Sequence, residues 1–210
     1  MKKGIVILSI CCLSGLSWSQ DASDNDQLFF GVKGGLNYSN VYDSKGEEFD
    51  ADPKFGFAGG VFTTIPIGSF LGIQPEVLFS QKGFSAKGNV LGSEYSLTRT
   101  TSFVDVPIYF AIRPSPWVSI VAGPQYSYLV KQRDVFENGK TTIAQEQEFG
   151  SQNIRKNILC FSGGLDINTD HLVVGARVGW DVQKNTGDGT STVPRYKNTW
   201  YQVTIGYRLY

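Results

Sequence analysis

Eight segments of the chain alternate apolar and polar residues with a period of two. Such alternation is typical of a β-strand that has one face in an apolar medium and the other in a polar one. Short turns and long polar stretches alternate between these segments, which predicts an all-β fold, an eight-stranded antiparallel up-and-down barrel. The predicted strands are residues 28–38, 55–65, 70–83, 101–113, 117–131, 157–167, 172–181, and the segment from residue 200 onward.

The connections between these strands suit a barrel in the outer membrane of a Gram-negative cell. Three short turns are predicted at residues 66–69, 114–116 and 168–171, and four long polar loops at 39–54, 84–97, 132–155 and 182–197. Strands of this length are sufficient, because a tilted membrane strand needs about 9–11 residues. Aromatic residues stand near the strand ends on the apolar face, where interfacial girdles lie: Tyr38, Phe55, Tyr126, Tyr128, Trp180 and Tyr201.

Residues 1–19 have the features of a secretory signal peptide, with cleavage predicted after Ser19. Two lysines precede an apolar run, and small residues stand at the −3 and −1 positions. A transmembrane anchor is the alternative, but the run is shorter than the ~20 helical residues that span a bilayer. Cys11 and Cys12 raise a lipoprotein alternative, against which bulky Ile10 stands where processing takes a small residue.

The remaining chain divides into a short polar lead, residues 20–27, and a barrel domain, residues 28–210. The formal net charge is 0 for the whole chain and becomes −2 once Lys2 and Lys3 leave with the signal. A basic patch is the usual mark of a nucleic-acid partner, so none is expected. The mature chain keeps one cysteine, Cys160, which excludes an intramolecular disulfide and is expected to be a packed residue.

Two other folds compete with the membrane barrel. Residues 55–73 carry no charge and could form a transmembrane helix, but their five glycines, Pro66 and β-branched residues favour a hairpin. A soluble lipocalin-like binding barrel would turn the same apolar faces inward. The polar faces are sparse and rich in small residues, and most charges lie in the long loops. This distribution favours a narrow lumen surrounded by outer-membrane lipid.

Four segments resemble strands of one family. Residues 74–83, Gln-Pro-Glu-Val-Leu-Phe-Ser-Gln-Lys-Gly, resemble the third strand of the PorT-like outer-membrane β-barrel family of the Bacteroidetes. Residues 103–109, 122–126 and 30–37 resemble its fourth, fifth and first strands. The resemblance implies a small barrel inserted by the outer-membrane assembly machinery, without implying the founding member's role in protein secretion. One departure is Tyr210, which falls one residue out of phase with the apolar face that ends at Leu209.

The polar faces of the predicted strands carry charges that should point into the lumen. Eight strands enclose a space that side chains just fill, and an unpaired buried charge is costly, so these charges must pair. We expect a lumen network of Glu76, Lys82, Asp105 and Arg177, in which Glu76 and Asp105 pair with Arg177 near mid-strand. The remaining charges on these faces are Lys33, Asp166 and Arg208.

No catalytic, metal or cofactor site is expected. His171 is the chain's one histidine and lies in a predicted short turn, and one histidine with one mature cysteine cannot build a Cys/His metal site. An acidic cluster in the first long loop offers oxygen ligands for Ca²⁺, but its spacing fits no known calcium loop, so a solvated loop is predicted. The cluster comprises Asp43, Glu47, Glu48, Asp50 and Asp52.

The function that these features favour is a non-enzymatic structural or surface-interaction barrel. Long loops on a rigid scaffold are the usual place for binding, here to an unknown surface partner. A narrow channel or a transport or secretion accessory is the alternative, although the bulky inward Phe62, Leu78, Phe103 and Tyr109 predict a blocked lumen. A membrane enzyme is a weaker alternative.

Overall fold

The computed structural model describes residues 28–43, 51–90, 93–138, 141–147, 155–184 and 196–209. The predicted signal peptide, the polar lead, Tyr210 and the centres of the long loops lie outside these ranges. The described residues form antiparallel strands, whose bounds are β1 Phe29–Asp43, β2 Ala51–Ile67, β3 Leu71–Val90, β4 Ser93–Ser115, β5 Val118–Asn138, β6 Thr141–Gln147, β7 Asn157–Asn168, β8 Leu172–Asp181 and β9 Tyr196–Leu209.

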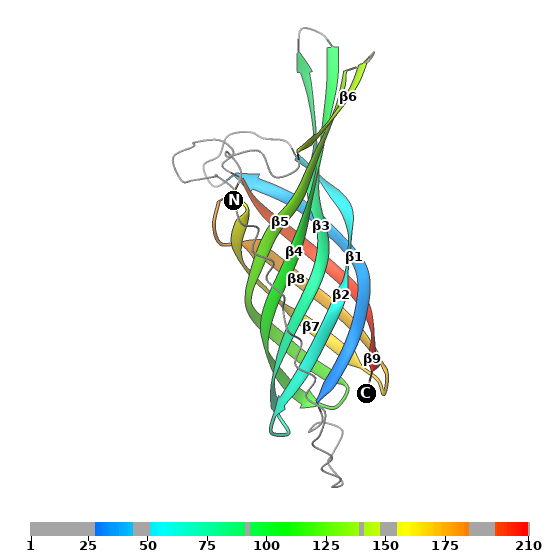
Figure 1. Cartoon of the computed structure of the whole chain (residues 1–210), viewed down its shortest axis with the longest axis vertical. Coiled ribbons are helices and arrows are strands. Elements are labelled where there is room, and N and C mark those ends of the chain that lie inside the picture. The colour runs from blue at the N-terminus through cyan, green and yellow to red at the C-terminus, as the bar shows by residue number, and fades with distance from the viewer. Residues whose placement is uncertain are drawn as a thin grey trace, which may run out of the picture.

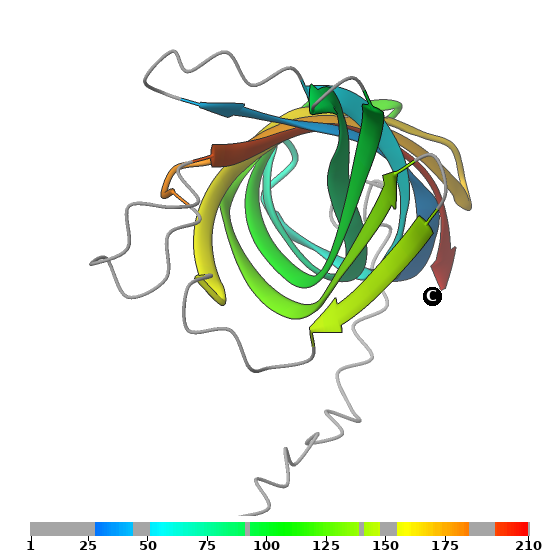
Figure 2. The same cartoon turned by 90° about the horizontal axis from the view of Figure 1, so that it is seen from above.

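Eight of these strands close into a barrel. Each strand pairs with its neighbour along the chain, except that β5 pairs with β7 as well as with β6. The ring closes because β1 pairs with β2 on one side and with β9 on the other, from Phe30↔Leu209 to Asp43↔Tyr196. Seen from above, the strands enclose a round interior (Figure 2). The predicted eight-stranded up-and-down fold is confirmed, and β6 is an additional strand beside the ring.

The strands β3, β4 and β5 extend well beyond their predicted ends and leave the barrel at one end. Residues 84–90 of β3, 93–99 of β4, 132–138 of β5 and all of β6 form a protruding sheet (Figure 1). The predicted long loops 84–97 and 132–155 are therefore wrong over these residues. The sequence of the protruding sheet lacks the regular apolar alternation that marks the strands below it, and at its base Phe84 and Ala86 are buried.

The apolar faces of the barrel strands point outward. Leu36 of β1 and Val203 of β9 are register neighbours, each 57% exposed, whereas Asn37 and Gln202 beside them are buried. The soluble lipocalin-like alternative is therefore wrong, because it requires these faces to point inward. Residues 55–73 form the β2–β3 hairpin, which turns at Gly68 with a φ of 73°. Among the described residues, no helix is long and apolar enough to cross a membrane.

Exposed aromatic side chains mark two levels on the outer face. At the upper level Tyr38 lies between Phe55 and Tyr201 in the strand register, and the Tyr38 and Phe55 ring centroids are 4.8 Å apart. β1 continues five residues above this level to Asp43. At the lower level Phe70 and Trp117 are exposed in the short turns. Short turns face the periplasm in outer-membrane barrels, so the protruding sheet is extracellular.

Candidate functional site

A neutral cluster of four charged side chains crosses the lower half of the interior. Lys33 Nζ lies 2.6 Å from Glu76 Oε1, and Arg177 Nη2 lies 2.7 Å from Asp166 Oδ2 and 3.8 Å from Glu76 Oε1. The Gln74 amide donates to Glu76 and to Asp166, at 2.8 and 3.2 Å. All four charged side chains are at most 3% exposed. Such ion pairs are maintained in a buried site because each charge has both a counter-charge and hydrogen bonds.

This cluster forms because inward positions on separate strands meet across a narrow barrel. Lys33 lies on β1, Glu76 on β3, and Asp166 and Arg177 on β7 and β8. Two cation–π contacts add to it, with Lys33 Nζ 4.9 Å from the Phe62 centroid and Arg177 Cζ 5.2 Å from the Tyr109 centroid. The strand tilt that closes a barrel brings these residues to one level.

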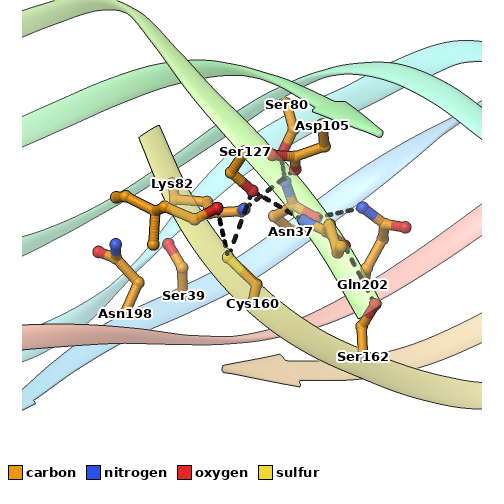
Figure 3. A network of polar contacts seen from close by, with 12 residues as sticks. Asn37, Ser39, Ser80, Lys82, Asp105, Ser127, Cys160, Ser162, Asn198 and Gln202 are labelled. Carbon is orange, nitrogen blue, oxygen red and sulfur yellow. Dashed lines mark hydrogen bonds and ion pairs between the residues drawn. The ribbon is translucent and has the colours of Figure 1, made fainter. Parts of the chain in front are cut away.

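A second cluster lies in the upper half of the interior, around Lys82. Its Nζ is 3.0 Å from Asp105 Oδ2 and lies over the Trp200 ring, 3.8 Å from the centroid. Close by, Asp181 Oδ2 accepts hydrogen bonds from the backbone and side-chain amides of Asn198, at 2.9 and 2.6 Å. Figure 3 shows Lys82, Asp105, Cys160 and Asn198 converging on this part of the interior.

Hydrogen bonds connect the two levels through small polar side chains (Figure 3). A continuous series with spacings of 2.9, 3.0, 3.1, 3.3 and 3.2 Å joins Tyr109, Ser162, Gln125, Ser127, Cys160 and Asp181. On the other side of the interior, Asn37 donates to Ser80 at 3.0 Å and accepts from Gln202 at 2.9 Å. Cys160 is thus a packed, hydrogen-bonded residue.

Bulky side chains fill the space between these polar groups. Phe62, Leu78, Phe103 and Tyr109 all point inward and are 2–3% exposed. Two glycines make room for the largest rings: a Cβ at Gly31 would lie 2.4 Å from Phe62 Cε1, and one at Gly179 would lie 2.3 Å from Trp200 Cζ2. Asp105 Oδ1 and Asp166 Oδ1 are buried without a hydrogen-bond partner among the described residues.

The structure separates the four residues expected to form the lumen network. Glu76 and Arg177 lie together in the lower cluster, whereas Lys82 and Asp105 form a pair of their own above it. The expected pairing of Asp105 with Arg177 is wrong. Sequence reasoning placed Lys33 and Asp166 on the polar face but missed their pairing with Glu76 and Arg177. Which inward charges meet depends on strand tilt and stagger, which no single strand's sequence reveals.

The predicted acidic cluster falls mostly outside the described residues. Asp43 ends β1, and Glu47, Glu48 and Asp50 belong to the undescribed part of the loop. Asp52 lies on β2, strongly exposed and 4.0 Å from Lys87 Nζ. The described part of the chain contains no group of three or more His, Cys, Asp or Glu side chains that could hold a metal. His171 lies in the turn between β7 and β8 and stacks on Tyr207, with ring centroids 5.6 Å apart.

A third polar cluster fixes the base of the protruding sheet, above the upper aromatic level. Arg99 donates two hydrogen bonds of 2.8 Å to the two Asp134 oxygens and one of 3.0 Å to the Tyr196 hydroxyl. Phe84 packs edge-on against Tyr196, with centroids 5.6 Å apart. Burial raises the pKa of the Tyr196 phenol, so its hydroxyl stays protonated. Apolar–polar patterning did not predict this cluster, because Phe84, Asp134 and Tyr196 fell in predicted loops.

Comparison with known proteins decides the family. The family model described as "Outer membrane protein beta-barrel domain" matches residues 18–186. The chain belongs to this family. As a member with an outward apolar belt, it is an integral protein of the cell outer membrane. No curated protein matches the chain.

Solved structures that are similar to the chain include outer-membrane proteins. Ail, the attachment invasion locus protein of Yersinia pestis, in complex with sucrose octasulfate, has a TM-score of 0.50 and 14% identity, covering 87% of this chain and 99% of that one. Neisserial surface protein A has a TM-score of 0.48 and 12% identity, covering 86% and 97%. OprG from Pseudomonas aeruginosa has a TM-score of 0.40 and 14% identity, covering 89% and 98%. At these identities the likeness concerns the fold alone.

Proposed function

We propose that this protein is a closed, non-enzymatic barrel that holds the protruding sheet above the membrane as a surface for contacts outside the cell. The observation that carries the proposal is the sheet itself, in which β3, β4 and β5 continue without a break from the barrel wall. Continuous strands make a stiffer support than loops do. The Arg99–Asp134 contact further fixes the sheet where it leaves the barrel.

The filled interior supports the closed state over the channel alternative. Two ion-pair clusters, the hydrogen-bond series and four bulky side chains occupy the space that a channel would need. Moving an ion through it would require breaking buried ion pairs, each of which is costly to separate. The Cys160 thiol donates to Asp181 in this interior, but it is 1% exposed, so a substrate does not reach it as an enzyme would need.

Kinship with the PorT-like branch, and insertion by the outer-membrane assembly machinery, are part of this proposal. Four segments at residues 30–37, 74–83, 103–109 and 122–126 support the kinship. Each lies on a barrel strand, so the kinship concerns the barrel wall. A role in protein secretion is not part of the proposal.

A variant with a trimmed sheet tests the proposed role. In this variant one two-residue Asn-Gly turn joins Ala86 to its register partner Leu97 and replaces the residues between them. A second Asn-Gly turn joins Asp134 to its register partner Gln145 and replaces the residues between those two. The Arg99–Asp134 contact is retained in this variant. Fluorescent proteoliposomes carrying either protein are then allowed to adhere to intact cells of the organism that makes it. We expect the wild type to adhere and the trimmed variant to lose most adhesion, while both barrels resist SDS until heated.

Equal adhesion by the two proteins would overturn the surface role. Planar-bilayer recordings test closure separately: we expect no steady conductance from the wild type. Steps whose ion selectivity changes in Arg177→Ala would establish the channel alternative instead.

A further inference from the structure

A cavity of about 700 Å³ opens at the periplasmic end of the barrel, away from the protruding sheet. All three short turns contribute to this end. Arg113 and Trp117 flank the β4–β5 turn, and His171 lies in the β7–β8 turn. Arg113 Nη2 also donates hydrogen bonds to the carbonyls of Gly68 and Leu71 around the β2–β3 turn. The volume is in the range of small-molecule sites, about 300–1,000 Å³.

The cavity ends blindly inside the barrel. Phe62, Thr64 and Gln74 lie at its inner end. Gln74 donates to Glu76 and Asp166, so the lower ion-pair cluster lies directly behind this wall. The cavity is therefore a pocket that a periplasmic molecule can enter from one side, and in the described part of the chain the lower ion-pair cluster separates it from the cell-surface end.

The charges in the lining favour an anion. Arg113 and Arg208 supply two guanidinium groups, and the described lining holds a single carboxylate, that of Asp170, which is exposed. Arg208 is held in place by a 2.6 Å bond to Asn168 and by packing on Phe29, 4.8 Å from the ring centroid. A guanidinium carries five N–H donors and can bind a carboxylate or phosphate with two parallel hydrogen bonds, so each of these arginines suits such a group.

The apolar part of the lining defines the rest of the ligand. Phe29, Phe62 and Trp117 present aromatic rings around the same cavity that holds the two arginines. Ligand sites combine apolar walls with a few fixed polar groups in this way. We propose that the cavity binds a small periplasmic organic anion, with its carboxylate or phosphate at Arg113 and Arg208 and its apolar body against the aromatic rings.

Calorimetric titration of the mature protein, folded in a zwitterionic detergent, tests the proposal. The probe is phenyl phosphate, with benzyl alcohol as an uncharged aromatic and inorganic phosphate as a bare anion. We expect saturable one-to-one binding of phenyl phosphate, at least tenfold weaker binding of inorganic phosphate, and none of benzyl alcohol. Absence of saturable phenyl phosphate binding, or equal binding of benzyl alcohol, would overturn the proposal.

Substitutions then locate the site. We expect Arg113→Gln combined with Arg208→Gln to weaken phenyl phosphate binding at least tenfold, and Arg133→Gln in the protruding sheet to leave it unchanged. If the double variant does not fold, Arg208→Gln alone, at a partly exposed position, should weaken binding severalfold. Unchanged binding in a folded arginine variant would place the probe elsewhere and overturn the assignment.

The chain itself offers a competing occupant. Asp21, Asp24 and Asp26 shortly precede Phe29 in the sequence. Replacing all three with Asn should leave phenyl phosphate affinity within twofold of the wild type. If binding is absent in the wild type and emerges only in this variant, the chain's own acidic lead fills the cavity, and the proposal of a periplasmic ligand fails.

Discussion

Lys82 and Asp105 form an ion pair of 3.0 Å inside the barrel, where neither side chain is more than 2% exposed. They lie on the neighbouring strands β3 and β4 but are not register partners, since Lys82 is opposite Thr101 and Asp105 is opposite Leu78. The long lysine side chain bridges this offset, and its ammonium group also lies over the Trp200 ring. The pair therefore ties together three strands of the ring: β3, β4 and β9.

Lys82→Met should destabilise the barrel by about 3–5 kcal/mol, because it leaves the buried Asp105 carboxylate without its counter-charge. Urea unfolding in phospholipid vesicles, followed by tryptophan fluorescence, measures this change. The double variant Lys82→Met with Asp105→Asn should recover more than half of the loss, because no unpaired charge remains. A single variant as stable as the wild type would contradict this account of the pair.

The Cys160 thiol should resist labelling in the folded protein. It is 1% exposed and hydrogen-bonded between Ser127 and Asp181. We expect a polyethylene-glycol maleimide to modify the mature protein only after it is boiled in SDS. Cys160→Ser with Thr169→Cys, in an exposed turn, should label at once and serves as the control. Rapid labelling of folded wild type would mean that the interior is open.

Arg99→Lys should loosen the protruding sheet and leave the barrel unchanged. Lysine cannot reproduce the bidentate hydrogen bonds that Arg99 donates to Asp134. Because the Asp134 side chain is 21% exposed, we expect the local stability of the sheet to fall by about 1 kcal/mol. Hydrogen exchange should become about fivefold faster in residues 93–99 and 133–138, with barrel amides unaffected. Arg133→Lys, at an exposed position, is the matched control. Equal exchange in both variants would show that Arg99 does not fix the sheet.

Ile205→Arg should lower stability in a bilayer by about 2–4 kcal/mol, because Ile205 faces lipid midway along β9 between Tyr201 and Leu209. Tyr42→Arg, on the outer face of β1 but above the upper aromatic level, should change stability by less than about 1 kcal/mol. Urea unfolding in phosphatidylcholine vesicles compares the two variants. If both variants lose the same stability, the membrane belt does not lie where the aromatic residues place it.

The sequence predicted the barrel well wherever a strand separates lipid from the interior. Residues 172–181 were predicted as a strand with the bounds that β8 has, since apolar and polar positions alternate there without interruption. β4 shows the opposite result: residues 93–100 are strand, but their sequence, which is rich in threonine and serine, carries no apolar–polar alternation. Period-two patterning reports a difference between two media, so it disappears above the membrane.

The interior was predicted only in part. Polar alternation placed Glu76, Lys82, Asp105 and Arg177 on inward faces, but it assigned Asp105 to Arg177 when its partner is Lys82. Lys33 and Glu76 are separated by the whole of β2, so their contact depends on the curvature of the closed ring. The Arg99 cluster was missed because none of its four strands was expected to extend so far.

The pairing of β1 with β9 also determines when the molecule can fold. Phe30 pairs with Thr63 of β2, but its partner on the other side, Leu209, is made almost last, so the ring cannot close on a growing chain. Contacts so far apart in sequence form slowly, because a long loop must be ordered before they stabilise anything. Until then β1 has an unpaired edge that can add a strand from another chain. Loss of β9 would therefore leave an open, aggregation-prone sheet instead of a smaller barrel. The edge of the first strand, β1, is protected from pairing with other chains only after the last strand, β9, has joined it.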